Sequence, residues 1–169
     1  MDARAHEDRD EAWMADAIRL AVREKGIDPA ATPIAALVVR DGRLIASGVN
    51  RTQECCDATA HAEIEAFRAA GKALGSMRIE GATLYSTLQP CGMCTMAAIW
   101  AGISRIVYGA GRDDVHPMYF EARHLSTFDF VADAFKDDLS LTGGVMARDC
   151  AALYYRPWDD VPEDQQANT

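Results

Sequence analysis

Apolar residues change their spacing along this chain in a way that marks successive helices and strands. A spacing of three and four residues runs through about Asp10–Lys25 and puts Trp13, Ala17 and Leu20 on one face, as in an amphipathic helix. Ile34–Arg40 then brings a continuous aliphatic run, which is typical of a buried strand. The pattern therefore predicts a surface helix followed by a strand in the core.

A tight hairpin and a regular alternation of elements follow. Asp41-Gly42 is a strong signal for a two-residue turn, with Arg43–Gly48 as the return strand. We expect further helices at about Ala60–Ala70, Cys91–Ala101, Phe128–Phe135 and Ala147–Tyr155, and strands at Ala82–Thr87, Ser104–Ala110 and Leu139–Val145. Strands that alternate with helices predict an α/β layered domain.

The chain has the length of one domain built around a single core, with 169 residues. We expect this domain to cover residues 1–156. Residues 157–169 contain Pro157, Pro162 and a polar run, so they predict a tail with little structure of its own. The tail would either close over a site as a lid or pack against a neighbouring subunit.

The composition is that of an ordinary soluble protein, with 49% hydrophobic and 25% charged residues. The longest apolar stretch, around Met96–Ile103, is far shorter than the roughly 20 residues of a membrane span. The first residues are acidic and polar and lack the features of a secretory signal. We therefore expect no membrane association and a cytoplasmic location.

The net charge of −9 bears on the choice of partner. Proteins that bind nucleic acids usually carry a basic stripe or patch. The basic residues Arg68, Lys72 and Arg78 are dispersed along this chain instead of clustered. The charge therefore favours a small-molecule substrate over a nucleic acid.

Two cysteines occupy the start of one predicted helix. The five cysteines are an odd number, which argues against a disulfide framework. Cys91 and Cys94 are three residues apart and follow Pro90, a residue that is common where helices begin. Both sulfur atoms would lie on one face of the first turn, where the helix dipole favours thiolates.

His61 and Glu63 are two residues apart, a spacing that does not bring side chains together inside a helix. They can approach one metal ion only from the N-terminal end of a helix, and Thr59 is a suitable cap for a helix that starts there. Together with the cysteine pair, this spacing predicts two helix N-termini directed at one metal ion.

The number of ligands separates a catalytic zinc site from a structural one. His61, Cys91 and Cys94 provide three ligands, which leaves a fourth position for water and Glu63 as a proton carrier. A structural zinc site would need a fourth protein ligand, and Cys55 or Cys56 could supply it if the loop before His61 folded back. The spacing alone leaves both alternatives open.

The order His61-Ala62-Glu63 and then Pro90-Cys91-Gly92-Met93-Cys94 resembles the signature of the cytidine and deoxycytidylate deaminase superfamily. The resemblance implies a three-layer α/β/α fold with a central mixed five-stranded sheet. It also implies bound Zn²⁺, addition of hydroxide to the amine-bearing carbon of a ring, and Glu63 as general base and acid. The N–H of Cys91 and the carbonyl of Gln89 would help to hold the ring.

Several segments resemble the bacterial guanine deaminases within this superfamily. Asp57–Glu63 is similar to their D-P-T-A-H-A-E, with Ala58 in place of the proline, and Gly48–Arg51 is similar to a G-x-N-R stretch that binds the base. The tail at Arg156–Val161 is similar to the lid of fungal cytosine deaminase. The resemblance implies substrate contacts at Asn50, Ala62, Gln89, Trp100, Glu121 and Trp158.

These resemblances lead to one functional hypothesis and several alternatives. We expect a zinc-dependent deaminase that converts guanine to xanthine and ammonia and acts as a homodimer. Cytosine and s-triazines of the ammeline type are alternative substrates. A nucleoside or tRNA adenosine deaminase is a further alternative, which the acidic charge disfavours, and a non-enzymatic zinc module is the last.

Overall fold

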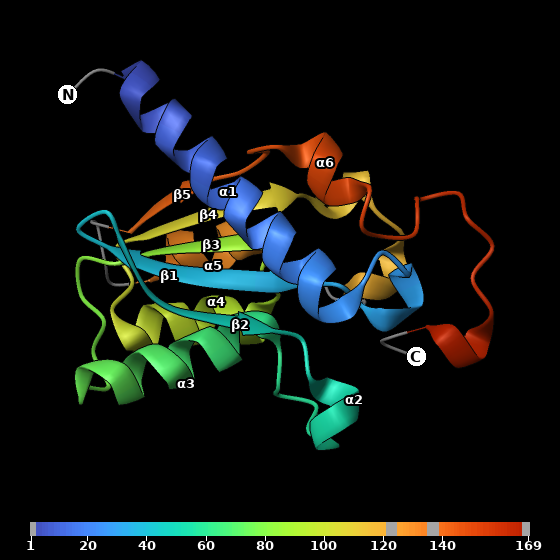
Figure 1. Cartoon of the computed structure of the whole chain (residues 1–169), viewed down its shortest axis with the longest axis horizontal. Coiled ribbons are helices and arrows are strands. Elements are labelled where there is room, and N and C mark those ends of the chain that lie inside the picture. The colour runs from blue at the N-terminus through green and yellow to red at the C-terminus, as the bar shows by residue number, and fades with distance from the viewer. Residues whose placement is uncertain (1–2, 121–124, 135–138, 167–169) are drawn as a thin grey trace.

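A mixed five-stranded sheet forms the centre of this protein (Figure 1). The computed structural model describes residues 3–120, 125–134 and 139–166. The strands are β1 (Ala35–Arg40), β2 (Arg43–Val49), β3 (Thr83–Leu88), β4 (Arg105–Ala110) and β5 (Ser140–Thr142), in the order β2-β1-β3-β4-β5. β1 is antiparallel to both of its neighbours, whereas β3, β4 and β5 are parallel.

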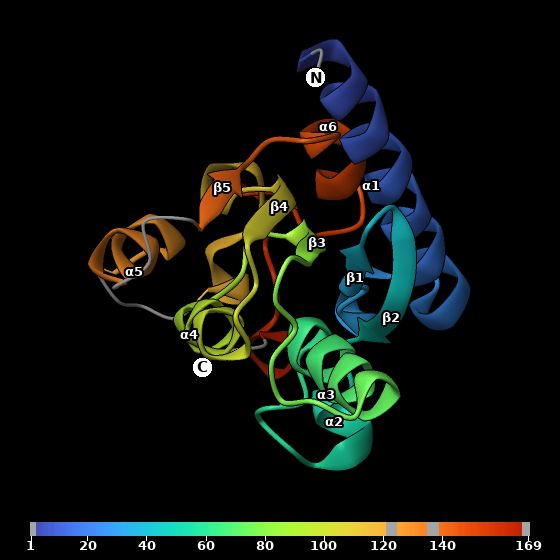
Figure 2. The same ribbon diagram turned by 90° about the vertical axis from the view of Figure 1, so that its left-hand side faces the viewer.

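Helices cover both faces of the sheet (Figure 2). The long α1 (Ala3–Lys25) and the short α6 (Ala147–Ala151) lie on one face; α3 (Ala62–Leu74) and α4 (Gly92–Ala101) lie on the other, with α5 (Thr127–Asp133) beside α4. The sheet therefore lies between two helical layers, which confirms the predicted three-layer α/β/α fold.

The alternation of side chains in β1 divides the core into two clusters. Leu37 and Val39 point into the cluster under α1, whereas Ala36 and Val38 point into the cluster under α3 and α4. Because both faces of β1 are buried, its sequence is a continuous apolar run with no polar alternation. The prediction of a buried strand at this position is confirmed.

The turn between β1 and β2 has the expected geometry. Asp41 and Gly42 both have positive φ angles, of 54° and 70°, as a type I′ turn requires at its two central residues. Gly48, near the end of β2, has a different role, because the backbone of α3 passes directly over it. This close approach sets the distance between α3 and the sheet.

Several helix boundaries differ from those predicted. α1 begins at Ala3 instead of about Asp10, because its first two turns carry few apolar residues and periodicity could not detect them. α3 runs to Leu74 instead of Ala70, so that Gly71 lies inside the helix and Gly75, at φ 62°, ends it. α6 ends at Ala151 instead of Tyr155 and β5 is shorter than predicted.

Short helical turns occupy segments that the sequence analysis left as loops. They are α2 (Thr52–Cys55) and the 3₁₀ turns η1 (Pro29–Ala31), η2 (Arg112–Asp114), η3 (Pro117–Tyr119) and η4 (Glu163–Gln165). Most of them surround the carboxyl ends of β3 and β4, where ligands bind in open α/β sheets. None of the described helices is long and apolar enough to cross a bilayer.

A buried ionic network connects α1 to the end of the sheet where β4 begins. Asp10 is 5% exposed and accepts hydrogen bonds from the Arg105 guanidinium at 2.7 and 2.6 Å and from the Tyr85 hydroxyl at 2.8 Å. Arg105 is the first residue of β4, so this network lies away from the carboxyl ends of the parallel strands. It therefore stabilises the fold without contacting the site described next.

Candidate zinc and nucleobase site

Two helix N-termini meet at the carboxyl end of the sheet. His61 is the N-cap residue of α3 and Cys91 is the N-cap residue of α4, and both have extended backbones. Neither side chain makes a capping hydrogen bond to its own helix, and both turn towards a shared point. The predicted convergence of two helix ends is therefore present, with His61 in the cap position instead of Thr59.

His61, Cys91 and Cys94 bring three metal-ligating atoms within 4.8 Å of one another. The His61 Nδ1 atom lies 3.7 Å from the Sγ atom of each cysteine. A tetrahedral zinc ion with ordinary Zn–N and Zn–S distances separates such a nitrogen and sulfur by about 3.6 Å. The donor types and their spacing fit zinc as the structure stands, without rearrangement of the side chains.

The structure bears on the alternative of a closed, structural zinc site. Cys55 and Cys56 are both exposed, at the end of α2, and Cys56 donates a weak hydrogen bond to the Gln53 carbonyl. Among the described residues, the metal-ligating group contains three members and neither of these two cysteines. The arrangement is that of an open site, in which one coordination position is left for water.

Glu63 lies beside the three ligands with its carboxylate buried. One of its oxygens accepts a hydrogen bond from the Ser86 hydroxyl at 3.2 Å, and the other lies 3.5 Å from the Cys94 sulfur. Burial raises the pKa of this carboxyl above its ordinary value. A carboxyl with a raised pKa next to a water position is suited to accept a proton and return it.

The pKa values of the two thiols in the cluster are shifted in opposite directions. A hydrogen bond from Cys94, with further help from His61, lowers the pKa of Cys91 to about 5. The same bond and burial raise the pKa of Cys94 well above its usual range. The lowered pKa of Cys91 favours its thiolate, which is the form that zinc binds.

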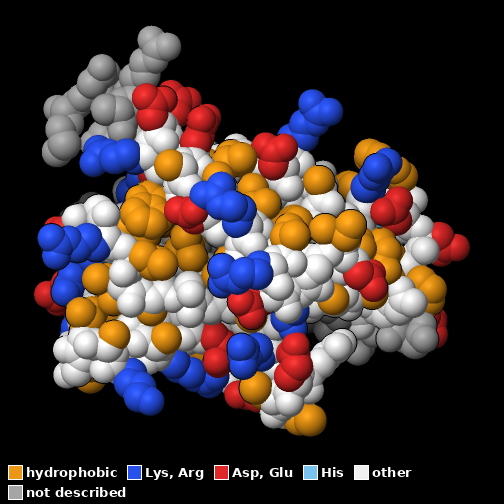
Figure 3. Space-filling model, viewed as in Figure 1, with side chains coloured by type: hydrophobic (Ala, Val, Ile, Leu, Met, Phe, Trp, Pro, Cys, Tyr) orange, Lys and Arg blue, Asp and Glu red, His pale blue; other side chains and the backbone are white. Residues whose placement is uncertain are grey.

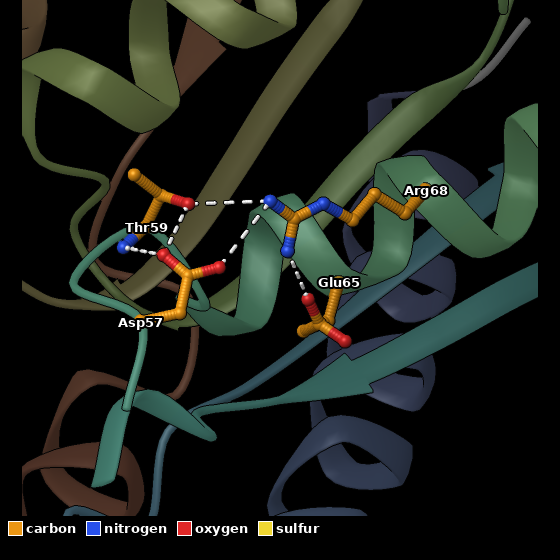
Figure 4. A network of polar contacts seen from close by, with 4 residues as sticks. All are labelled: Asp57, Thr59, Glu65 and Arg68. Carbon is orange, nitrogen blue, oxygen red and sulfur yellow. Dashed lines mark hydrogen bonds and ion pairs between the residues drawn. The ribbon is translucent and has the colours of Figure 1, made fainter. Parts of the chain in front are cut away.

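A polar network fixes the loop that carries His61 (Figure 4). Asp57 accepts hydrogen bonds from the backbone N–H and the hydroxyl of Thr59, both at 2.7 Å. Arg68, two turns into α3, donates to the Thr59 hydroxyl at 3.2 Å and to Glu65 at 2.5 Å. The polar groups of Thr59 are thus used in hydrogen bonds within the loop, which explains why this residue does not cap the helix as predicted.

A cavity of about 310 Å³ lies against His61. Asn50 lines it, as the resemblance implied, and its amide nitrogen donates to the hydroxyls of Thr32 at 2.7 Å and Thr52 at 3.4 Å. Both bonds use the nitrogen, so the carbonyl oxygen is the acceptor that Asn50 can offer to a ligand. Asn50 thus lines the same cavity as His61, one of the three metal-ligating residues.

Two predicted contact residues lie away from this cavity. Trp100 is 71% exposed and lines an apolar groove on the outer side of α4, because six residues after Cys94 the helix has turned its side chain away from the cysteines. Trp158 is 76% exposed, in a turn of the tail. Within one chain neither residue lines the cavity. Glu121, the third predicted contact, lies outside the described residues. The homodimer stays a prediction.

Gln89 and Ala62 are buried next to the site, but both side chains are engaged elsewhere. The Gln89 amide donates to Thr127 at 3.4 Å and accepts from the Arg112 N–H at 3.3 Å. Ala62 is fully buried at the start of α3, where it faces β2. The predicted contacts of these residues with a substrate stay predictions, and any contact by Gln89 would use its backbone.

The sequence analysis missed several residues that line the cavity. They come from four separate segments and are Thr32, Ile34, Thr52, Gln53, Ala58, Tyr119 and Gln166. Loop residues of this kind carry no periodic signal, because only the folded chain brings them together. Gln166 is the one that belongs to the predicted tail, so the tail returns to the cavity of its own chain.

Comparison with known proteins places this site in a family. The family model described as the cytidine and deoxycytidylate deaminase zinc-binding region matches residues 7–110. The tRNA-specific adenosine deaminase of Agrobacterium fabrum is 55% identical over 78 residues, which are 46% of this chain and 51% of that protein. The tRNA-specific adenosine deaminase of Buchnera aphidicola is 35% identical over 147 residues, which are 86% and 91% of the two chains.

Solved structures agree with the sequence comparisons. A guanine deaminase from Nitrosomonas europaea superimposes with a TM-score of 0.70 at 28% identity, over 85% of this chain and 81% of that chain. A structure from a study of tRNA:A34 deaminases superimposes with a TM-score of 0.64 at 33% identity, over 82% and 99%. The first curated relative is matched over only about half of its length.

The match to the family model covers more than half of the chain and includes all three metal-ligating residues. The fold and the open His/Cys/Cys cluster agree with it. This chain therefore belongs to the family of zinc-binding cytidine and deoxycytidylate deaminases, whose members are zinc hydrolases that act on C–N bonds.

Proposed function

We propose that this protein is a zinc-dependent hydrolytic deaminase of a free nucleobase and that guanine is its preferred substrate. The reaction adds water to guanine and yields xanthine and ammonia. The observation that carries the proposal is the cavity that the metal-ligating residue His61 and the polar residue Asn50 both line. A base held there would contact His61, whose cluster partner Cys94 lies 3.5 Å from the Glu63 carboxylate.

The residues of the site have different roles in the proposed reaction. His61, Cys91 and Cys94 would hold zinc, which when bound supplies a water activated for attack at neutral pH. The Glu63 carboxylate takes a proton from the attacking water and gives it to the departing amine, which therefore leaves as ammonia. The Ser86 hydroxyl holds one carboxylate oxygen in place during this transfer.

The size of the cavity supports a single base over a larger ligand. Its volume of about 310 Å³ lies at the lower end of the range of about 300–1,000 Å³ that small-molecule pockets cover. The carbonyl oxygen of Asn50 is suited to the N–H groups along the edge of guanine. The cavity thus supplies a small space and an acceptor for a donor-rich ring.

The charges near the cavity argue against a polynucleotide substrate. Lys25 pairs with Glu54, and Arg68 contacts both Asp57 and Glu65. Carboxylates therefore already neutralise cations that a phosphate backbone would need. Among the described residues on the face that Figure 3 draws, acidic and basic side chains are interspersed instead of gathered in a basic patch.

The tail supports the same choice. Val161 is buried, Gln166 donates to its carbonyl at 3.0 Å, and Gln165 accepts a hydrogen bond from the Tyr155 hydroxyl at 2.9 Å. These contacts hold the tail beside the cavity of its own chain. Because Gln166 lines the cavity, we expect a bound free base to contact the tail.

Adenosine in tRNA is the second candidate substrate, because the names of two relatives state that activity. A substrate panel separates the two. The zinc-loaded protein is incubated with guanine, cytosine, adenine, ammeline, their nucleosides and tRNA, and ammonia release is measured. We expect guanine to react fastest; ammonia from tRNA but from none of the free bases would refute the proposal.

Two variants test the mechanism with the best substrate. Glu63→Gln should lower the rate by about 10²–10⁴-fold, the usual contribution of a positioned general acid and base, while zinc content stays at that of the unaltered protein. Glu80→Gln, an exposed carboxylate paired with Arg78, serves as control and should react normally. A Glu63→Gln protein with full activity would exclude the assigned proton carrier.

A further inference from the structure

The first turn of α5 has an unusual residue in its buried position. Among the seven residues of α5, Thr127 is the only buried one, and it is 2% exposed. Phe128 beside it is 55% exposed. The helix therefore buries a hydroxyl where an apolar side chain would be expected, and a buried polar group costs stability unless a hydrogen bond compensates for it.

The Thr127 hydroxyl makes its compensating bond to the turn that carries the zinc ligands. It donates to the carbonyl oxygen of Pro90 at 2.6 Å, across 37 residues of sequence, and accepts from the Gln89 amide at 3.4 Å. The other end of the Gln89 amide accepts from the Arg112 N–H at 3.3 Å. One hydroxyl thus connects α5, the turn before α4 and the loop after β4.

The bonded carbonyl belongs to the peptide unit that joins Pro90 to Cys91. A peptide unit is planar, and the described peptide bonds are trans, so the carbonyl of Pro90 and the N–H of Cys91 point in opposite directions. Fixing the carbonyl therefore fixes the direction of the N–H. It also limits the backbone rotation that places the Cys91 sulfur, because the proline ring already fixes the preceding φ angle.

We propose that Thr127 is a positioning residue that orients the Pro90–Cys91 peptide, and through it both the Cys91 ligand and the Cys91 N–H, the group that the family resemblance assigns to the substrate. The part of this proposal that concerns the substrate rests on the proposed function. The hydrogen bond also polarises the peptide, which strengthens the Cys91 N–H as a donor. Thr127 acts through Cys91 and does not itself take part in the reaction.

The test compares two substitutions at one position. Thr127→Val keeps the shape of the side chain and removes the hydroxyl, whereas Thr127→Ser keeps the hydroxyl. Tyr85→Phe is the matched control, because it removes a buried hydroxyl bond of 2.8 Å to Asp10 at the opposite end of the sheet. Zinc dissociation constants are measured by competition with a chelator, and kcat and KM by ammonia release.

We expect Thr127→Val to weaken zinc binding by about 10–100-fold, the usual effect of losing a group that orients a metal ligand, and to lower kcat more than it raises KM. Thr127→Ser should bind zinc within about threefold of the unaltered protein, and Tyr85→Phe should lower only the melting temperature. Unchanged zinc affinity in Thr127→Val, with a loss of stability like that of Tyr85→Phe, would overturn the proposal. If the unaltered protein deaminates no free base, the proposed function fails, and the zinc titration still decides the role of Thr127.

Discussion

Gly48 offers the sharpest test of how the fold positions the zinc ligands. It lies in β2 directly beneath the first turn of α3, the helix whose N-cap is His61. A Cβ atom added at Gly48 would lie 2.4 Å from the carbonyl oxygen of Ala62 and 2.5 Å from the backbone nitrogen of Ala66. Both contacts are to helix backbone, which cannot turn aside as a side chain can.

The size of the expected effect follows from these distances. Ordinary van der Waals contact of a Cβ atom begins at about 3.4 Å, so Gly48→Ala must move α3 away from the sheet by about 1 Å. Overpacking of this kind costs about 1–3 kcal/mol of stability. A misplacement of about 1 Å at a reactive centre costs on the order of 10²-fold in rate, and His61 and Glu63 would move with the helix.

Urea unfolding and ammonia release measure the two effects on the same preparation. Gly48→Ala should unfold with a free energy about 1–3 kcal/mol lower and react on the order of 10²-fold more slowly. Gly71→Ala is the matched control in the same helix, where the added Cβ meets only the Ser76 carbonyl, at 3.2 Å. The reasoning is refuted if Gly48→Ala unfolds and reacts like the unaltered protein.

Two further predictions concern the ligand set and the distant ionic network. Cys55→Ser and Cys56→Ser should each retain one zinc ion per chain by metal analysis, because neither cysteine belongs to the ligand cluster; loss of zinc in either would restore the closed, structural site. Arg105→Leu leaves the carboxylate of Asp10 buried without its cation and should lower the free energy of unfolding by up to about 3–5 kcal/mol. Activity per folded molecule should not change, and a loss of less than about 1 kcal/mol would contradict this account.

The core strands and the reactive residues could be predicted because their signals are local. β1 and β4 are continuous apolar runs, and Asp41-Gly42 has the residue types that its turn requires. The spacings of His61 with Glu63 and of Cys91 with Cys94 fit a metal site only at the starts of two helices, and the structure places them there.

The prediction was weaker where a residue serves a distant partner. Thr59 is a residue type that commonly caps helices, but its hydroxyl and N–H bond to Asp57, and the N-cap is His61, two residues later. Trp100 follows the cysteines closely in sequence, yet the helix turns it to the outer surface. The role of Thr59 depended on its hydrogen bonds to Asp57. The position of Trp100 depended on the rotation of the helix between Cys94 and Trp100. Neither could be seen in the local sequence pattern.

The sequence by itself determined the chemistry, because ligand types and their spacing along a helix depend only on neighbouring residues. Only the tertiary structure decided what surrounds that chemistry. The cavity joins Asn50, Tyr119 and Gln166 from three distant segments, and the Pro90–Cys91 turn is held by Thr127 from a helix 37 residues away. Such contacts depend on how layers pack against the sheet, and packing is a property of the whole chain that no short segment encodes.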